Sequence, residues 1–119
     1  MKRVLAIDDT HYMLAMLSEC LQEAGHSVVT AQDGVEGLAQ LREHRPDMVI
    51  TDLNMPNMDG LQFVRAARRD PAGIDLPILL LTTETAQNLR DEAARAHATG
   101  WLCKPFEPDQ ILRLVEQLA

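Results

Sequence analysis

Short apolar runs alternate with longer stretches of helical period along this chain, and this alternation restricts the possible folds more than any other feature. Apolar residues fill every position of three runs, 4–7, 48–50 and 78–81, as expected for strands buried on both faces of a parallel sheet. Two further runs, 27–31 and 101–103, are mixed or short and fit more peripheral positions. Five strands separated by helices predict an α/β fold in which right-handed crossovers place helices on both faces of the sheet.

The stretches between the runs carry apolar residues at helical spacing, with charges on the opposite face. The first helix is expected over 11–24, and Gly25 supplies its stop. Three more helices are marked by Val35, Leu38 and Leu41, by Leu61, Val64 and Ala67, and by Ile111, Leu114, Val115 and Leu118. The remaining helix is the fourth in chain order. It is expected over 85–98 and has only Leu89 and several alanines on its inner side. Its burial should be shallow, so we expect the most movable helix there.

The chain has 119 residues, which suits one domain spanning residues 1–119. Its formal net charge of −7 disfavours nucleic acid or an anionic membrane surface as the main partner. No apolar run approaches the roughly 18 residues of a membrane span, so we expect a cytoplasmic protein. Cys20 and Cys103 lie in separate apolar segments and are expected to be reduced, buried packing residues.

Charged residues follow three of the predicted strands. Asp8 and Asp9 follow the first strand, Asp52 the third and Lys104 the fifth. Ligand sites of open α/β sheets lie beyond the carboxyl ends of the strands, so these side chains should converge. Two carboxylates about 4 Å apart repel by about 4 kcal/mol at an effective dielectric of 20, and one lysine cannot neutralise three of them. The cluster therefore predicts a divalent cation, and hard oxygen ligands favour Mg²⁺, for which Mn²⁺ can substitute.

Helix capping is the alternative explanation for Asp8 and Asp9, because such residues commonly begin helices. Asp52 favours the metal site instead. An Asp directly after a buried strand, at the same edge as Lys104, has no equally simple structural explanation.

Four sequence segments occur in order at the strand ends: Ile7-Asp8-Asp9, Thr51-Asp52-Leu53-Asn54-Met55-Pro56-Asn57-Met58-Asp59-Gly60, Leu81-Thr82-Thr83-Glu84 and Lys104-Pro105-Phe106. Together they resemble two-component response-regulator receiver domains over essentially the whole chain, and most of all the stand-alone CheY-type chemotaxis regulators. The resemblance implies a flavodoxin-like (βα)5 doubly wound fold whose five-stranded parallel sheet has the order 2-1-3-4-5.

The resemblance also implies roles for the residues of the acidic cluster. Asp52 becomes the phosphoacceptor, and its carboxylate would attack phosphorus to give an acyl phosphate. Asp8, Asp9 and Asp52 become acidic metal-site residues, and Lys104 supplies a charge for the phosphoryl oxygens. The family pattern further implies a cis bond between Lys104 and Pro105 that aims the lysine inward.

Four more roles rest on the resemblance. Thr82 and Trp101 match the hydroxyl and aromatic switch positions, so Thr82 would bond the phosphoryl group and Trp101 would fill the vacated space beneath the fourth helix. From the residues alone, Thr82 could simply end a strand, and a lone Trp could be core or interface packing. The main-chain carbonyl of Asn54 is implied as a further metal ligand, and Asn54 and Glu84 match the positions that tune dephosphorylation.

The implied protein is a signalling switch that catalyses only its own phosphorylation and dephosphorylation and is otherwise no enzyme. Its phosphoryl donor would be the phosphohistidine of a sensor histidine kinase of the chemotaxis type. The face made of helix four, strand five and helix five would then bind a downstream protein such as the flagellar motor switch. We expect a monomer, without nucleic acid or a membrane as partner.

Three alternatives remain open at this point. A phosphate sink or a phosphorelay intermediate would share every site residue and differ only in its partner. An aspartate-nucleophile phosphatase usually has a second Asp two residues after the nucleophile, where this chain has Asn54. A flavodoxin-like FMN carrier would need a phosphate-binding loop after the first strand, where Asp8 and Asp9 would repel a phosphate.

Overall fold

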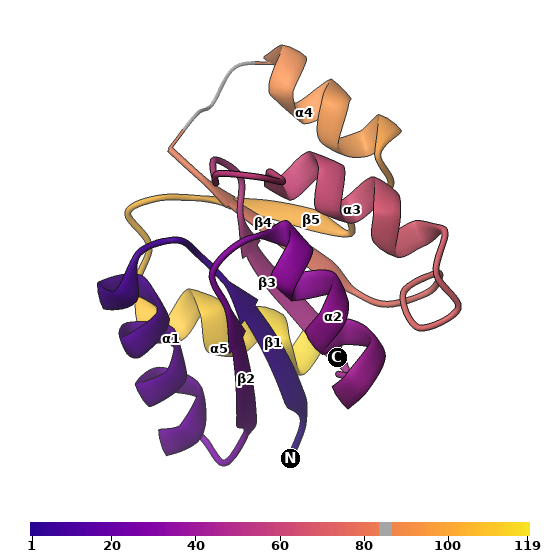
Figure 1. Ribbon diagram of the computed structural model, residues 1–119. Coiled ribbons are helices and arrows are strands. Elements are labelled where there is room, and N and C mark those ends of the chain that lie inside the picture. The colour runs from indigo at the N-terminus through magenta and orange to yellow at the C-terminus, as the bar shows by residue number, and fades with distance from the viewer. Residues whose placement is uncertain (84–86) are drawn as a thin grey trace.

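The computed structural model describes residues 1–83 and 87–119, with the backbone alone at 87–90. The strands of the described chain form one parallel sheet (Figure 1): β1 (Arg3–Ile7), β2 (Ser27–Ala31), β3 (Met48–Asp52), β4 (Ile78–Thr82) and β5 (Gly100–Cys103). Their order is β2-β1-β3-β4-β5, and every pairing is parallel. The predicted flavodoxin-like α/β fold with strand order 2-1-3-4-5 is therefore confirmed.

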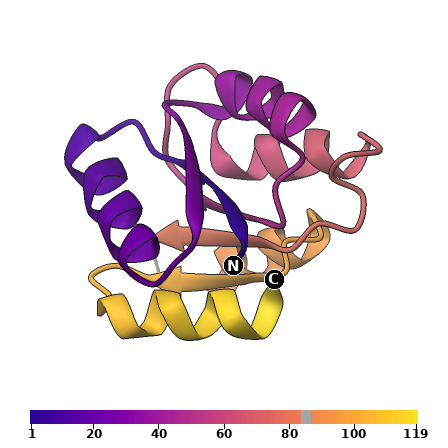
Figure 2. The ribbon, with the colours of Figure 1, turned by 90° about the horizontal axis from the view of Figure 1, so that it is seen from below.

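Helices cover both faces of this sheet (Figure 2). One face carries α1 (His11–Glu23) and α5 (Pro108–Leu118). The other face carries α2 (Gly34–His44), α3 (Gly60–Arg68) and α4 (Gln87–Arg95). An apolar cluster fills the space between the sheet and each helical layer, because the strands send alternate side chains to opposite faces.

The burial of the strands follows the predicted pattern. Every position of β3 and β4 is buried, as is every position of β1 after Arg3. The edge strands β2 and β5 are mostly half-buried. Fully apolar runs thus became the central strands, because residues there meet a helical layer on both faces.

Some element boundaries differ from the sequence prediction. Strand β3 extends through Thr51 and Asp52, and β4 extends through Thr82, so these polar residues belong to the ladder itself. Helix α1 ends at Glu23, and Gly25 after it takes the left-handed conformation with φ of 92° that the predicted stop requires. On α2, Val35 is exposed although the helical pattern placed it on the apolar face.

Helix α4 has a small buried face. Among its described side chains, only that of Ala93 is buried, and Ala96 follows just past its end. The predicted inner residue Leu89 lies outside the described side chains. The described part agrees with the predicted shallow burial, because two alanines remove little apolar surface from water.

None of the described helices is long and apolar enough to cross a membrane. Cys20 and Cys103 are both free thiols, which agrees with the predicted reduced state. Each is half-buried, so the prediction that they are buried was wrong. Cys20 lies on α1 beside the buried residue Leu21, and Cys103 ends the half-buried edge strand β5.

Candidate functional site

Three carboxylates meet at the carboxyl edge of the sheet. Asp8 follows β1, Asp9 comes next in the chain, and Asp52 ends β3 beside it. One carboxylate oxygen from each lies within 4.8 Å of the others. Asp8 is fully buried and Asp52 is 9% exposed, whereas Asp9 is exposed to solvent. The predicted convergence of the acids is confirmed, and the exposed member leaves the cluster open on one side.

The acids do not serve to cap α1. Thr10 is the N-cap residue of this helix, and its side chain accepts no capping hydrogen bond. The carboxylate of Asp8 instead accepts the main-chain N–H of Thr10 at 2.9 Å, which fixes the turn that leaves β1. The capping interpretation of Asp8 and Asp9 therefore fails, because no oxygen of either acid is bonded to the first turn of the helix among the described contacts.

Lys104 reaches into the cluster from the loop after β5. Its Nζ lies 3.0 Å from Oδ1 of Asp52 and 3.5 Å from Oδ2 of Asp8. The peptide bond between Lys104 and Pro105 is cis, as predicted. When all four groups are ionised, one ammonium faces three carboxylates, so negative charge remains in excess.

Burial and charge act together on Asp52. Burial raises the pKa of this carboxyl above its ordinary value, the hydrogen bond from Lys104 opposes that rise, and the charge of Asp8 adds to it. The balance is a raised pKa. Oδ1 accepts both the N–H of Leu53 at 2.9 Å and the ammonium of Lys104, whereas Oδ2 accepts no hydrogen bond from the described residues. One oxygen is thus held by the protein while the other remains available for chemistry.

The donor set suits a hard divalent cation. The three acids offer only oxygen ligands, and their partial exposure lets water complete a coordination shell, which is how Mg²⁺ is usually held. The excess negative charge of the cluster also needs a positive counterpart. Asn54, the implied main-chain ligand, lies two residues beyond Asp52 in the loop between β3 and α3 and is exposed.

A glycine holds that loop against the end of β3. The N–H of Gly60 donates to the carbonyl of Leu53 at 2.8 Å, and a Cβ at this position would overlap the carbonyl oxygen of Asp52. Asp59 caps α3 through a capping box with Gln62, whose N–H it accepts at 2.8 Å. The close approach of this turn to Asp52 became visible only in the structure.

Thr51 is a second feature that sequence reasoning missed. It is fully buried, and its hydroxyl donates to the carbonyl of Asp52 at 3.0 Å. The only signal in the sequence was a β-branched hydroxyl residue next to the acceptor Asp, and such residues are common in any strand. Its hydrogen bond restrains the backbone that carries the Asp52 carboxylate.

The predicted switch residues lie on neighbouring strands. Thr82 is buried at the end of β4, next to β3, and is opposite Cys103 in the register of β4 and β5. Trp101 on β5 is half-buried and packs on the same apolar cluster as Ala93 and Ala96. Glu84 lies outside the described residues. The structure thus places Trp101 in the layer that α4 covers, while its predicted movement is untested.

Comparison with known proteins identifies the class of this fold and site. The response regulator receiver domain family matches residues 4–116, so the chain belongs to this family. The response regulator MprA of Mycobacterium sp. (strain KMS) is 39% identical over 116 residues, which cover 98% of this chain and 50% of that protein. This chain therefore spans about half the length of that relative.

Two other similar proteins match along nearly their whole length. The protein PilH of Pseudomonas aeruginosa is 30% identical over 115 residues, which cover 97% of this chain and 95% of PilH. The solved structure of the chemotaxis response regulator CheY4 of Vibrio cholerae superposes with a TM-score of 0.94 at 44% identity, covering 100% of this chain and 99% of that one. The chain is thus a CheY-like receiver domain.

Proposed function

We propose that this receiver domain takes a phosphoryl group from the phosphohistidine of a sensor histidine kinase onto Asp52. The position of the Asp52 carboxylate beside Asp8 and Asp9 carries the proposal. Lys104 and Leu53 hold one of its oxygens, and the other accepts no hydrogen bond from the described residues. An oxygen of Asp52 forms the new bond to phosphorus. The bond from phosphorus to the imidazole nitrogen of the donor breaks, and that nitrogen keeps the electron pair.

Each neighbour of Asp52 has a defined part in this transfer. Lys104 already lies 3.0 Å from the acceptor carboxylate, so its ammonium can move onto a phosphoryl oxygen over a short distance. Thr51 and Gly60 fix the backbone of the acceptor, which keeps its carboxylate in line with the incoming phosphorus. In this scheme the domain catalyses only its own phosphorylation and dephosphorylation and is no enzyme toward other substrates.

Asp8, Asp9, Asp52 and the main-chain carbonyl of Asn54 are the proposed ligands of Mg²⁺, for which Mn²⁺ can substitute. When bound, the cation neutralises charge on the equatorial phosphoryl oxygens. The number of acids supports this assignment, because Lys104 alone cannot balance three carboxylates. Asn54 and Glu84 are proposed to tune the lifetime of the phosphoryl group.

Phosphorylation of Asp52 is proposed to cause a two-state conformational change at β4 and β5. Thr82 would turn its hydroxyl toward a phosphoryl oxygen, and Trp101 would move into the space so vacated beneath α4. The shared apolar cluster of Trp101, Ala93 and Ala96 supports this coupling, because a shift of the indole must change the packing of α4. The face of α4, β5 and α5 then binds the downstream protein.

The similarity to CheY4 and PilH favours a chemotaxis kinase as donor and a target of the flagellar motor switch type, with the domain acting as a cytoplasmic monomer. A phosphate sink or phosphorelay intermediate is the second candidate, because it would use the same acidic cluster and Lys104 and would differ only in its partner. Neither nucleic acid nor a membrane is proposed as a partner, since the net charge is −7.

Labelling with acetyl phosphate in the presence of Mg²⁺ tests the acceptor. The Asp52→Asn variant should lose all incorporation of phosphate, measured by intact mass or radiolabel. Asp109→Asn, which removes an exposed acid of the first turn of α5, is the matched control and should label like the wild type. Undiminished labelling of the Asp52→Asn variant would exclude Asp52 as the acceptor.

A further inference from the structure

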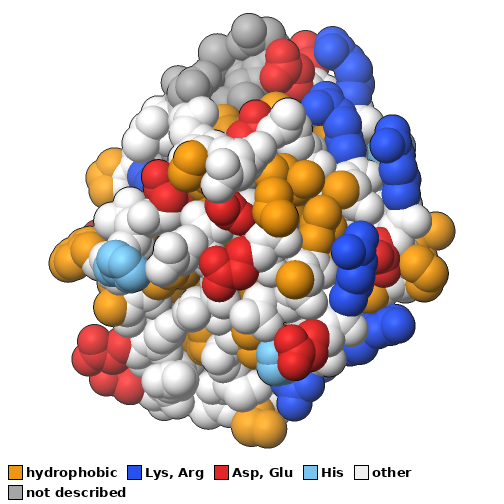
Figure 3. All heavy atoms as spheres, in the orientation of Figure 1, with side chains coloured by type: hydrophobic (Ala, Val, Ile, Leu, Met, Phe, Trp, Pro, Cys, Tyr) orange, Lys and Arg blue, Asp and Glu red, His pale blue; other side chains and the backbone are white. Residues whose placement is uncertain are grey.

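Basic side chains gather along one edge of this acidic molecule. Figure 3 shows Lys and Arg side chains in a column on the side where α3 and the end of α4 lie in Figure 1. A hollow of about 370 Å³ opens there, between the C-terminal ends of the two helices, and its lining consists of Arg65, Arg68, Arg69, Arg95, Ala96 and His97. This lining contains no acidic residue, although acids exceed bases by seven in the whole chain.

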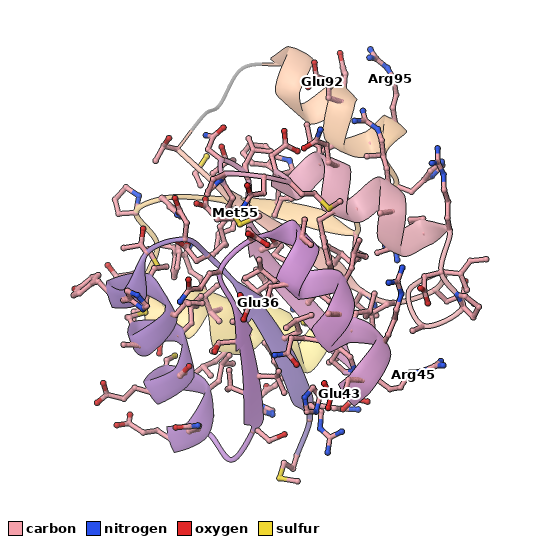
Figure 4. The ribbon with its side chains drawn as sticks, in the orientation of Figure 1. Glu36, Glu43, Arg45, Met55, Glu92 and Arg95 are labelled. Carbon is pink, nitrogen blue, oxygen red and sulfur yellow. The ribbon has the colours of Figure 1, made fainter. Side chains whose placement is uncertain are left out.

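Most of these arginine charges have no ion-pair partner among the residues that the structure describes. Arg65, Arg69 and Arg95 are exposed, and none of them forms an ion pair with any residue that the structure describes. The nearby Arg42 differs, because it is bonded to Asp70 at 2.7 Å. Figure 4 shows Arg95 extending from the end of α4 on this edge of the molecule. The uncompensated charges are therefore concentrated around the hollow.

Arg68 gives the hollow a fixed floor. Its guanidinium donates to the carbonyls of His97 at 3.0 Å and of Gly73 and Leu76 at 2.6 Å each. The bond to His97 ties the end of α3 to the segment that follows α4, and the other two tie it to the segment before β4. Carbonyl partners hold the guanidinium in place without removing its charge. Arg68 therefore contributes positive potential from a half-buried position, which the charge of Asp75 offsets in part.

Favourable interaction with the helix dipole explains only part of the concentration of arginines around the hollow. Arg65 and Arg68 lie in the last turn of α3 and Arg95 in the last turn of α4, where a cation interacts well with the helix dipole. Two helix ends carry together about one negative charge, and Asp75 adds one more near Arg68, against four arginine charges around this hollow. An excess of positive charge remains, and exposed like charges repel each other unless an anion lies between them.

We propose that this hollow binds a small anion with two linked phosphoryl groups, of the pyrophosphate or nucleoside diphosphate class, between Arg65 and Arg69 on the α3 side and Arg95 on α4. Planar guanidinium groups bind phosphoryl oxygens in bidentate fashion. One phosphoryl group can be held by one or two of them, whereas charges on two separate helices suit a longer anion. A bound ligand would join α4 to α3 at a site separate from the Asp52 cluster.

Calorimetric titration of the whole domain with sodium pyrophosphate, in chloride buffer without divalent cations, tests the proposal. We expect saturable binding of one pyrophosphate per chain. Arg65→Gln and Arg95→Gln should each weaken it about tenfold, because each removes charged hydrogen bonds. The matched control is Arg113→Gln, which removes an exposed arginine of α5 away from the hollow and should change the affinity less than twofold. Circular dichroism verifies that each variant is folded.

Three results would overturn the proposal. They are the absence of saturable binding to the wild type, an equal loss in Arg113→Gln and Arg95→Gln, and binding of inorganic phosphate as tight as that of pyrophosphate. Parallel titrations with ADP and GDP distinguish the source of the ligand. If these nucleotides bind more tightly than pyrophosphate, the site is assigned to nucleotides. If they bind equally tightly, the site recognises the diphosphate alone. Asp52→Asn should bind pyrophosphate like the wild type, so failure of this site and failure of the phosphoacceptor are separable.

Discussion

Burial and two neighbouring charges of opposite sign act on the pKa of the Asp52 carboxyl group. Burial and Asp8 raise its pKa, while Lys104 stabilises its charged form. A raised folded-state pKa means that the folded protein holds this proton more tightly than the unfolded chain does. The resulting stability is fully present below the unfolded pKa near 3.8 and is lost as the pH rises through the folded value.

The sign of this linkage predicts a stabilising substitution. Without divalent cations at pH 7, Asp52→Asn should raise Tm relative to the wild type, because it removes a buried charge next to Asp8. A domain of this size gains about 4 °C per kcal/mol. Thermal melts between pH 7 and pH 4 should show the advantage shrinking as the wild-type carboxyl takes up its proton. Asp109→Asn serves again as control, and an advantage that is independent of pH would contradict the assignment.

Lys104 is the only cation within ion-pair distance of the acidic cluster among the described residues. Lys104→Met should slow labelling by acetyl phosphate by about 100-fold, because one positioned charge for the developing phosphoryl oxygens is lost. Initial rates at saturating Mg²⁺ measure this effect. Lys2→Met, at the opposite end of the sheet, should leave the rate unchanged, and an equal rate in the Lys104→Met variant would remove the lysine from the proposed transfer.

At the scale of elements, the turn that starts α3 determines where Asp52 lies. Gly60→Ala should cost about 2 kcal/mol or more and also slow labelling, because a methyl group there overlaps the carbonyl of Asp52 and must displace the end of β3. Gly100→Ala is the matched control, since its added Cβ would meet Leu79 at an ordinary 3.6 Å. Urea unfolding gives both stabilities. A loss at Gly60 no greater than at Gly100 would show that the turn tolerates the side chain.

The packing of Trp101 in the layer under α4 predicts an optical signal. Addition of beryllofluoride and Mg²⁺ should change the fluorescence of this indole, which is the only Trp of the chain. Thr82→Val keeps the shape of the side chain but removes its hydroxyl, so the change should be greatly reduced. If the wild type shows no change, Trp101 does not report on the acceptor site and the proposed coupling fails.

At the scale of the whole molecule, cation binding should increase the stability of the folded domain. A ligand at ten times its dissociation constant stabilises a folded protein by about 1.4 kcal/mol. Adding Mg²⁺ at that concentration should therefore raise the Tm of the wild type by several degrees, with a much smaller effect in Asp9→Asn, which keeps the two buried acids. Scanning calorimetry measures both shifts. Equal stabilisation of the two proteins would place the cation elsewhere.

Local sequence determined much of this architecture. Apolar runs without interruption could only be central strands, because both faces of those strands are covered by helices. The acids and Lys104 directly follow strands, and parallel strands end at one edge, so their convergence could be predicted without coordinates. The strand order and the roles of Thr82 and Trp101 came instead from the family resemblance, because no local pattern encodes which strands are neighbours.

Only the tertiary structure decided the remaining features, since no local sequence pattern specifies them. The contact of Gly60 with Asp52, the bond of Thr51 to the same carbonyl and the half-burial of the two cysteines depend on how elements pack. The arginine hollow likewise arises because the ends of α3 and α4 meet across 30 residues of sequence, from Arg65 to Arg95. Local pattern specifies which side of an element is buried, and packing alone specifies what that side faces.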